Sequence, residues 1–195
     1  LGKWTLAEGL VYPNYAKAIY DDDFEGPADS YCVSLDYGTS NPFAALRWEK
    51  RNGTWYAVDE LYYSGRDTGI QKTDGQYLRM LEGFVEPILE YTKYSRRDIW
   101  GNLEDGNERI PVIVDPSAAS FIALLRQSSV FRPVSANNEV INGIRRTSTA
   151  IENGLIKIHK RCRNWQSEAQ SYVWDTHSVE DAPVKDFDHL MDATR

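Results

Sequence analysis

The sequence has little sulfur and histidine, and it has no long apolar run. Its 195 residues include only two cysteines and three histidines. Cys32 and Cys162 have no second cysteine or histidine at zinc-motif spacing, and two cysteines make no disulfide framework. We therefore expect both thiols to be reduced and buried. No run approaches the roughly 18 apolar residues of a spanning helix, and no signal peptide opens the chain. These absences predict a soluble intracellular protein.

Positive charge is also in short supply. The formal net charge at pH 7 is -7, which argues against a nucleic-acid-binding protein that is basic over its whole surface. The basic residues nevertheless cluster at 96–97, 145–146 and 157–163. A local basic face for phosphate contacts is therefore compatible with an acidic site elsewhere. Solvated ends of helices and strands explain any single cluster at least as well.

Length and composition predict one compact domain. The chain is 42% hydrophobic and 26% charged, which are ordinary globular values. Residues 1–29 are turn-rich and end in an acidic run, so we interpret them as a lead-in or linker, and residues 30–195 as the domain. The chain begins without Met and stops inside an expected helix that has no capping signal. We therefore expect a piece of a longer protein, truncated at its C-terminus.

Strand and helix patterns alternate along the domain. Strand-like runs at 31–36, 43–49 and 54–61 come first, and Asn52-Gly53 favours an antiparallel hairpin between the last two. We expect helices at 77–89 (after a capping box of Thr73 and Gln76), 117–127, 140–152, 165–174 and from about 186, with strands at 111–115, 131–134 and 155–158. The order predicts an α/β fold. Its mixed central sheet would have three antiparallel strands followed by parallel strands, with helices on both faces.

Two of these strands end on an aspartate. Asp36 closes the first strand and Asp115 closes the strand at 111–115. Each has a structural explanation, because Asp36 precedes a turn that it would cap and Asp115 stands where a helix N-cap is expected. In an open α/β sheet, however, groups at the carboxyl ends of neighbouring strands converge on one crevice. We expect Asp36 and Asp115 to meet there if their strands are neighbours.

A third acidic group lies near the end of the chain. On a helix, Asp192 shares a face with Asp188 and His189, although a surface His–Asp pair at a helix N-terminus explains this pattern equally well. Three carboxylates in one place repel one another unless a cation is present, so the combination predicts a divalent metal site. Oxygen ligands with one imidazole suit Mg²⁺ or Mn²⁺. Two such ions about 4 Å apart would activate a water and stabilise the leaving oxygen of a phosphodiester.

Four motifs carry a resemblance to a known family. They are Leu35-Asp36-Tyr37-Gly38 with Asn41-Pro42, Val58-Asp59-Glu60-Leu61-Tyr62-Tyr63, Val114-Asp115-Pro116-Ser117, and Asp188-His189-Leu190-Met191-Asp192-Ala193-Thr194-Arg195. Together with the order of elements, they resemble the RNase H-like superfamily. In detail they look like the nuclease domain of tailed-bacteriophage large terminase subunits. The resemblance covers residues 31–195, and its last motif is the most specific.

This resemblance implies a metal-dependent endonuclease that cuts concatemeric double-stranded DNA by two-metal phosphodiester hydrolysis. The implied metal-binding acids are Asp36, Asp115 and Asp192, with His189 as a further ligand or proton-transfer group. Candidate DNA contacts are Lys185, Arg145 and Arg146. Glu60 also matches the family pattern, and its structural alternative is a strand-end residue that orders the neighbouring loop.

The resemblance also implies partners. Family members carry an ATPase motor domain before the nuclease, and this sequence has no Gly-x-x-x-x-Gly-Lys-Ser/Thr phosphate loop. The motor would therefore lie in a missing N-terminal part that residues 1–29 connect to the nuclease. The full-length protein would assemble with the small terminase subunit and the portal in the cytoplasm of the infected bacterial host. No membrane partner is expected.

Other functions remain open. Residues 36–40 also resemble the first phosphate loop of actin and sugar-kinase ATPases, but that fold needs a second similar domain and 195 residues barely hold one. Residues 67–69 read Asp-Thr-Gly, as in aspartic proteases, without the all-β pattern of such enzymes. The main alternative is a catalytically inactive RNase H-like module that binds DNA or a partner. An acidic cluster without metal would repel DNA, which argues against it.

Overall fold

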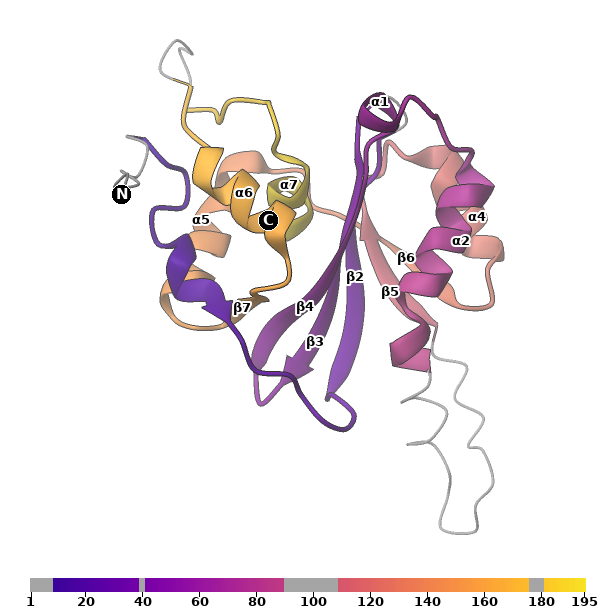
Figure 1. Ribbon diagram of the computed structural model, residues 1–195, viewed down its shortest axis with the longest axis horizontal. Helices are drawn as coiled ribbons and strands as arrows, with labels where there is room; N and C mark the ends of the chain where they lie inside the picture. The colour runs from indigo at the N-terminus through magenta and orange to yellow at the C-terminus, as the bar shows by residue number, and fades with distance from the viewer. Residues whose placement is uncertain (1–8, 39–40, 90–108, 176–180) are drawn as a thin grey trace.

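A central β-sheet separates two layers of helices (Figure 1). The computed structural model describes residues 9–38, 41–89, 109–175 and 181–195. Within these ranges, seven strands form one sheet in the order β1-β7-β4-β3-β2-β5-β6. The predicted α/β fold, with a mixed sheet and helices on both faces, is confirmed. None of the described helices is long and apolar enough to cross a membrane.

The elements follow the predicted order. The strands are β1 (Ile19–Tyr20), β2 (Ser30–Asp36), β3 (Phe43–Arg51), β4 (Thr54–Tyr63), β5 (Ile110–Val114), β6 (Phe131–Ser135) and β7 (Ile156–His159). The helices whose bounds lie within the described residues are η1 (Tyr15–Ala18, a 3-10 turn), α1 (Gly65–Thr68), α2 (Asp74–Phe84), α4 (Ala119–Gln127), α5 (Val140–Glu152), α6 (Arg163–Ser171) and α7 (His189–Thr194). The last helix begins at His189 and not near 186, because Phe187 has a φ of 52° that no α-helix accommodates.

The first three long strands form the expected antiparallel unit. β2 pairs with β3, and β3 pairs with β4. The connection between β3 and β4 has Asn52 at a φ of 51° and Gly53 at 84°, the left-handed conformations of a tight hairpin turn. The remaining strands add in parallel on both sides. β5 joins β2, β6 joins β5, and β7 joins β4.

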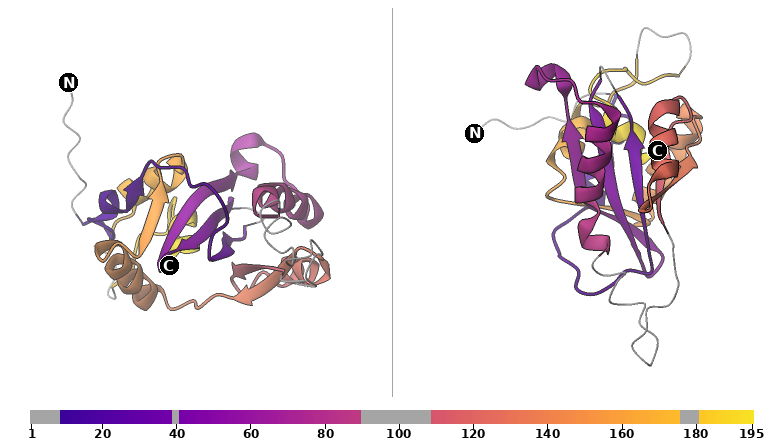
Figure 2. Two further views of the ribbon diagram at one scale, coloured as in Figure 1. Left: turned by 90° about the horizontal axis from the view of Figure 1, so that it is seen from below. Right: turned by 90° about the vertical axis from the view of Figure 1, so that its right-hand side faces the viewer.

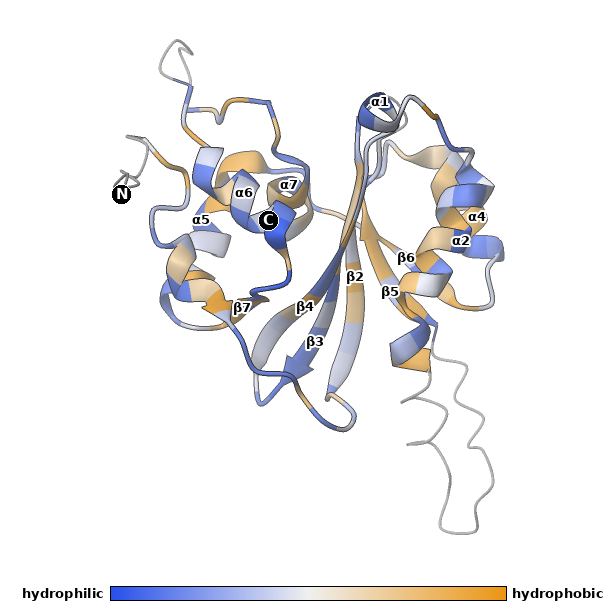
Figure 3. Ribbon diagram, in the orientation of Figure 1, coloured by the Kyte–Doolittle hydropathy of each residue, from blue (hydrophilic) through white to orange (hydrophobic). Residues whose placement is uncertain are grey.

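Each face of the sheet has its own core. Val33 and Leu35 of β2 pack under α2 and α4. Cys32 of the same strand packs under α5, α6 and α7 on the opposite face, as side-chain alternation requires. The two further views in Figure 2 show the same separation of layers. Figure 3 shows β5 as an almost continuously apolar strand, as expected of a parallel strand covered on both faces. Cys32 and Cys162 are free and buried, as predicted.

Part of the segment that we interpreted as a lead-in belongs to the folded domain. Tyr12 and Ala18 are fully buried, and Tyr12 packs against Tyr172 with ring centroids 5.8 Å apart. β1 pairs in parallel with β7 and so extends the edge of the sheet. Residues 10–20 therefore contribute to the core beneath α5 and α6.

Truncation of Tyr12 tests this contribution. Tyr12→Ala leaves a large cavity at a fully buried position, and we expect the free energy of unfolding to fall by about 3–5 kcal/mol in urea titrations. Phe187 is 65% exposed, so Phe187→Ala is the matched aromatic control and should change it by less than about 0.5 kcal/mol. Similar small changes in both variants would contradict a structural role for residues 10–20.

Candidate functional site

Asp36 and Asp115 end two neighbouring strands. β2 and β5 pair in parallel with Leu35 opposite Val114, so the next residue on each strand is an aspartate at the same edge of the sheet. Ile113 packs with the core beneath α7, and alternation places Asp115 on that face too. Asp36 and Asp115 line one small pocket of about 50 Å³. The sequence analysis expected Asp36 and Asp115 to meet if their strands were neighbours, and the strands are neighbours.

The chain turns sharply after Asp36. A Cβ atom at Gly38 would lie 2.5 Å from the carbonyl oxygen of Asn41, so this close approach admits only glycine. The carboxylate of Asp36 is engaged by His189 on α7. Oδ2 of Asp36 lies 2.8 Å from Nδ1 of His189. The motif thus combines a tight turn with a carboxylate that faces α7.

Asp115 is held by its own turn. Its Oδ1 accepts a hydrogen bond of 2.6 Å from the backbone amide of Ser117. A hydrogen bond with the Ser117 side chain and this backbone bond lower the pKa of Asp115. The explanation of Asp115 as a helix N-cap is wrong, because α4 begins at Ala119 and its N-cap position is Ala118. The short turn before the helix keeps the Asp115 carboxylate at the strand end.

His189 opens α7 and forms an ion pair with Asp36. Burial lowers the pKa of His189, but the hydrogen bond and the charge of Asp36 outweigh burial, so the net pKa lies above its ordinary value. This shift favours the protonated imidazole. Tyr62, on β4, also lines the site, and its ring centroid is 6.5 Å from that of His189.

Asp192 lies one helical turn after His189 and is neutralised by two cations. Its Oδ2 accepts a 2.9 Å bond from Nζ of Lys185, and its Oδ1 accepts a 2.7 Å bond from Nε of Arg195. Burial raises the pKa of Asp192, but Arg195 and Lys185 lower it more, so the net pKa falls. Asp188, expected on the same helical face, stands at the N-cap position of α7. Asp188 is buried, and burial with the nearby charge of Asp192 raises its pKa. Its Oδ2 lies 3.2 Å from Nζ of Lys185, which therefore pairs with both carboxylates.

Two adjoining pockets share these residues. A cleft of about 540 Å³ lies between the ends of β2 and β4, α1 and the segment before α7. It is lined by Asp36, Asn41, Pro42, Tyr62, Ser64, Arg66, Asp67, Lys185, Asp186, Phe187, Asp188, His189 and Asp192. Asp115 lines the smaller pocket with Arg195 and the 136–138 loop, and Asp36 and Asp192 line both. These two carboxylates therefore mark the boundary between the cleft and the Asp115 pocket.

The ligand types at this site fit a divalent ion, although Asp36 and Asp192 are bonded to basic side chains in this structure. Carboxylate oxygens of Asp36, Asp115 and Asp192 with one imidazole are ligands suited to Mg²⁺ or Mn²⁺. In the described part of the chain, no three His, Cys, Asp or Glu side chains converge closely enough to hold an ion. Asp192 would have to exchange Lys185 and Arg195 for metal, a change of side-chain rotamers that leaves the strand pairing intact.

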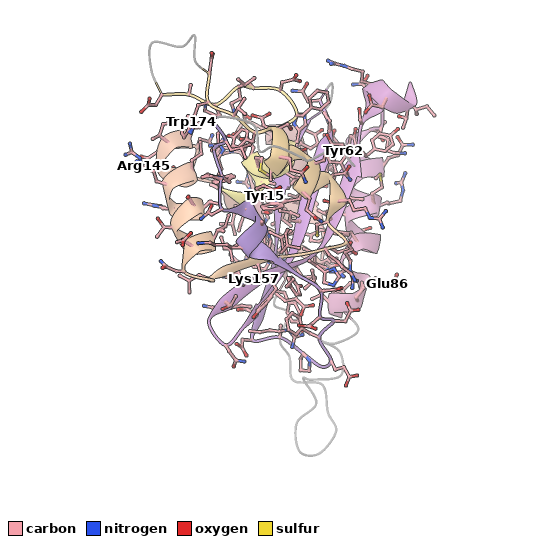
Figure 4. All side chains as sticks on the ribbon, turned by 60° about the vertical axis from the view of Figure 1, so that its left-hand side comes forward. Tyr15, Tyr62, Glu86, Arg145, Lys157 and Trp174 are labelled. Carbon is pink, nitrogen blue, oxygen red and sulfur yellow. The ribbon has the colours of Figure 1, made fainter. Side chains whose placement is uncertain are left out.

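The candidate DNA contacts fall in two places. Lys185 lines the cleft and is about half exposed. Arg145 and Arg146 are exposed on α5 and are not among the described residues that line either pocket. Figure 4 shows Arg145 on the outer side of α5, apart from Tyr62. The basic pair at 96–97 lies outside the described residues.

The sequence analysis missed several residues of this region. Arg66 and the exposed Phe187 line the cleft, and no periodic pattern indicates either. Glu60, which the sequence analysis did name, is not among the residues that line the cleft. Its carboxylate accepts bonds from the backbone amides of Asn164 and Trp165 at the start of α6. Glu168 is buried beside α7, and its signal was a glutamate on the buried face of the helix around Trp165.

No protein-family model and no curated protein sequence matches the chain. Solved structures do match it. The large terminase of a thermophilic bacteriophage, solved in complex with ADP, is 39% identical over 99% of this chain, with a TM-score of 0.81. The chain belongs to the large terminase family. It spans about 45% of the length of that relative.

Other large terminases show which part of the protein the chain matches. The nuclease domain of the P22 large terminase is 17% identical, with 97% of this chain and 91% of that chain covered and a TM-score of 0.68. The large terminase nuclease domain of bacteriophage SPP1 with bound Mn is 20% identical, with 95% of each chain covered and a TM-score of 0.55. The chain therefore has the RNase H-like fold of a terminase nuclease domain, as the motifs predicted.

The pairing of Asp36 with His189 generates a prediction. Asp36→Asn removes the charge that raises the pKa of His189 and leaves the burial that lowers it, so this pKa should fall below that of the wild type. Titration of the imidazole signals by NMR measures the change. Asp67→Asn, which alters another carboxylate at the cleft, is the control and should leave the pKa of His189 in place. An unshifted pKa in Asp36→Asn would contradict the ion pair.

Proposed function

We propose that this terminase chain is a metal-dependent endonuclease domain that cuts concatemeric double-stranded DNA during packaging by two-metal phosphodiester hydrolysis. The observation that carries the proposal is the meeting of three acids and one imidazole from β2, β5 and α7 on two adjoining pockets. Terminase nuclease domains of phages G20c and SPP1 have been solved with bound magnesium and bound manganese, respectively, which supports the same role for this chain.

In this proposal Asp36, Asp115 and Asp192 hold two Mg²⁺ or Mn²⁺ ions. Such ions would activate a water and stabilise the leaving oxygen of the cut strand. Nδ1 of His189 is engaged by Asp36, so Nε2 is the nitrogen that is left to act as a ligand or to carry a proton. Neutralisation of Asp192 by metal would release Lys185 from that carboxylate. Lys185 also pairs with Asp188 at 3.2 Å and lines the cleft, where its ammonium group would bind a DNA phosphate in exchange for Asp192.

The cleft offers further contacts for DNA. Arg66 approaches from α1 on one side, and Lys185 with the exposed ring of Phe187 approaches from the other. Phosphate contacts position a duplex without reading its sequence, so we infer cutting that is largely sequence-independent. Arg145 and Arg146 on α5 would contact DNA only where it extends beyond the cleft.

The remaining proposals concern the longer protein. The thermophilic-phage large terminase of which this chain spans about 45% has been solved in complex with ADP and with ATP-gamma-S. We infer that an ATPase motor domain precedes this nuclease domain, which includes residues 10–20 in its core. The small terminase subunit and the portal would be the assembly partners, in the cytoplasm of the infected host.

One observation favours a second function, an inactive module that binds DNA or a partner. Asp192 is occupied by Lys185 and Arg195, and the described side chains form no ready-made metal site. A module of this kind would keep the cleft and never exchange these cations for metal.

Plasmid nicking and linearisation distinguish the two functions. We expect cutting with Mg²⁺ or Mn²⁺ and none with EDTA. Asp36→Asn, Asp115→Asn and Asp192→Asn should each lower the rate by more than about 100-fold, because loss even of an outer-shell partner of a metal costs about 10- to 100-fold. Glu82→Gln on α2, away from the cleft, is the control and should cut at the wild-type rate. A folded chain that cuts with neither metal would refute the nuclease in favour of the binding module.

A further inference from the structure

Glu168 is a buried carboxylate behind the site. It lies on α6, is 5% exposed and does not line the cleft. Its Oε2 accepts hydrogen bonds from the backbone amides of Leu190, at 2.6 Å, and Met191, at 3.2 Å. These amides follow His189 directly in the first turn of α7. Glu168 is therefore hydrogen-bonded to the backbone of the helix that carries His189 and Asp192.

α7 depends on this contact because it has no cap of its own. The helix has six residues, and the side chain of its N-cap residue Asp188 makes no capping bond to the described residues. The first amides of any helix need acceptors from outside its own ladder, and isolated helices of this length are unstable in water. Glu168 supplies the acceptor from a neighbouring helix. The Oγ1 of Thr194 accepts a further bond of 2.9 Å from Nε1 of Trp165, which ties the end of α7 to α6 as well.

The N-terminus of α6 is also bonded to a glutamate from a neighbouring element. Its N-cap residue, Cys162, makes no side-chain capping bond within the described ranges. Glu60 of β4 takes that role, since its two oxygens accept bonds of 2.8 Å and 3.0 Å from the amides of Asn164 and Trp165. One glutamate thus links the sheet to α6, and a second links α6 to α7.

We propose that Glu168 is a positioning residue of the nuclease site, which holds α7 where His189 meets Asp36 and Asp192 reaches the boundary of the two pockets. This inference rests on the proposed nuclease function for its catalytic consequence. Glu168 acts through its reach to two amides. A single oxygen serves both bonds, and its Oε1 has no hydrogen-bond partner in the described part of the structure.

Three substitutions separate reach from the carboxyl group itself. Glu168→Gln keeps the length and an acceptor oxygen, Glu168→Asp keeps the carboxyl group but is one methylene shorter, and Glu168→Ala removes both. In the metal-free protein, hydrogen exchange at the Leu190 and Met191 amides should stay within a few-fold of wild type in the Gln variant. In the Asp and Ala variants it should accelerate by about 10-fold or more.

The same variants are then compared in metal binding and turnover. Mn²⁺ affinity from calorimetry should fall by about 10- to 100-fold in the Asp and Ala variants, as for lost outer-shell partners. Their kcat for plasmid cutting should fall with it, while KM for DNA stays within about twofold because Arg66 and Lys185, the proposed DNA contacts at the cleft, lie outside α7. Glu168→Gln should remain near wild type. Glu82→Ala on α2, across the sheet, is the control and should match wild type throughout.

The proposal would be overturned if Glu168→Asp had the hydrogen-exchange rates and the Mn²⁺ affinity of the wild type. A Gln variant that behaves like Ala would also overturn it, since the effect would then follow the carboxyl group and not the length of the side chain. If Glu168→Ala fails to fold, the comparison of Gln with Asp still decides. If the wild type neither cuts DNA nor binds Mn²⁺, the proposed function fails, and the exchange of the two amides still tests whether Glu168 holds α7.

Discussion

Parallel pairing of β2 with β5 is the constraint on which the site depends. It sets Leu35 opposite Val114 and so brings Asp36 and Asp115 to one edge of the sheet, where their negative charges repel. α7 adds Asp192 to the same place. The structure offsets this charge with the His189 imidazole and with Lys185 and Arg195. In the metal-free chain, these basic side chains neutralise the charge of the three carboxylates. In an active nuclease, divalent ions would neutralise the same charge.

The second constraint is that α7 must be fixed in place relative to the sheet. A helix of six residues has little stability of its own, so its place must come from its neighbours. Glu60 anchors α6 to β4, and Glu168 anchors α7 to α6, each by hydrogen bonds to the first free amides of the next helix. Leu190 and Met191, both fully buried, add apolar contact with the core beneath α5 and α6. Strand pairing thus places Asp36 and Asp115, and contacts with α6 and the core place the groups on α7.

Local chemistry in the sequence predicted most of the fold. Asn52-Gly53 specifies its hairpin through left-handed φ angles, and the capping box of Thr73 and Gln76 starts α2. The aspartates that end β2 and β5 were recognisable because apolar strands end abruptly at them. Long-range contacts were not readable in this way. Burial of Tyr12, the bonds from Glu168 to α7 and the cations on Asp192 depend on which segments meet in space. The late start of α7 follows from the φ of Phe187, a residue type that gives no warning of it.

The central claim is that Asp36 and Asp115 at the strand ends and Asp192 on α7 form one metal centre. Anomalous X-ray scattering from crystals of this chain soaked in Mn²⁺ tests it most directly. Two manganese peaks about 4 Å apart should appear between Asp36, Asp115 and Asp192, with Lys185 and Arg195 displaced from Asp192. Absence of peaks there, with Lys185 and Arg195 still bound to Asp192 at saturating Mn²⁺, would contradict the claim.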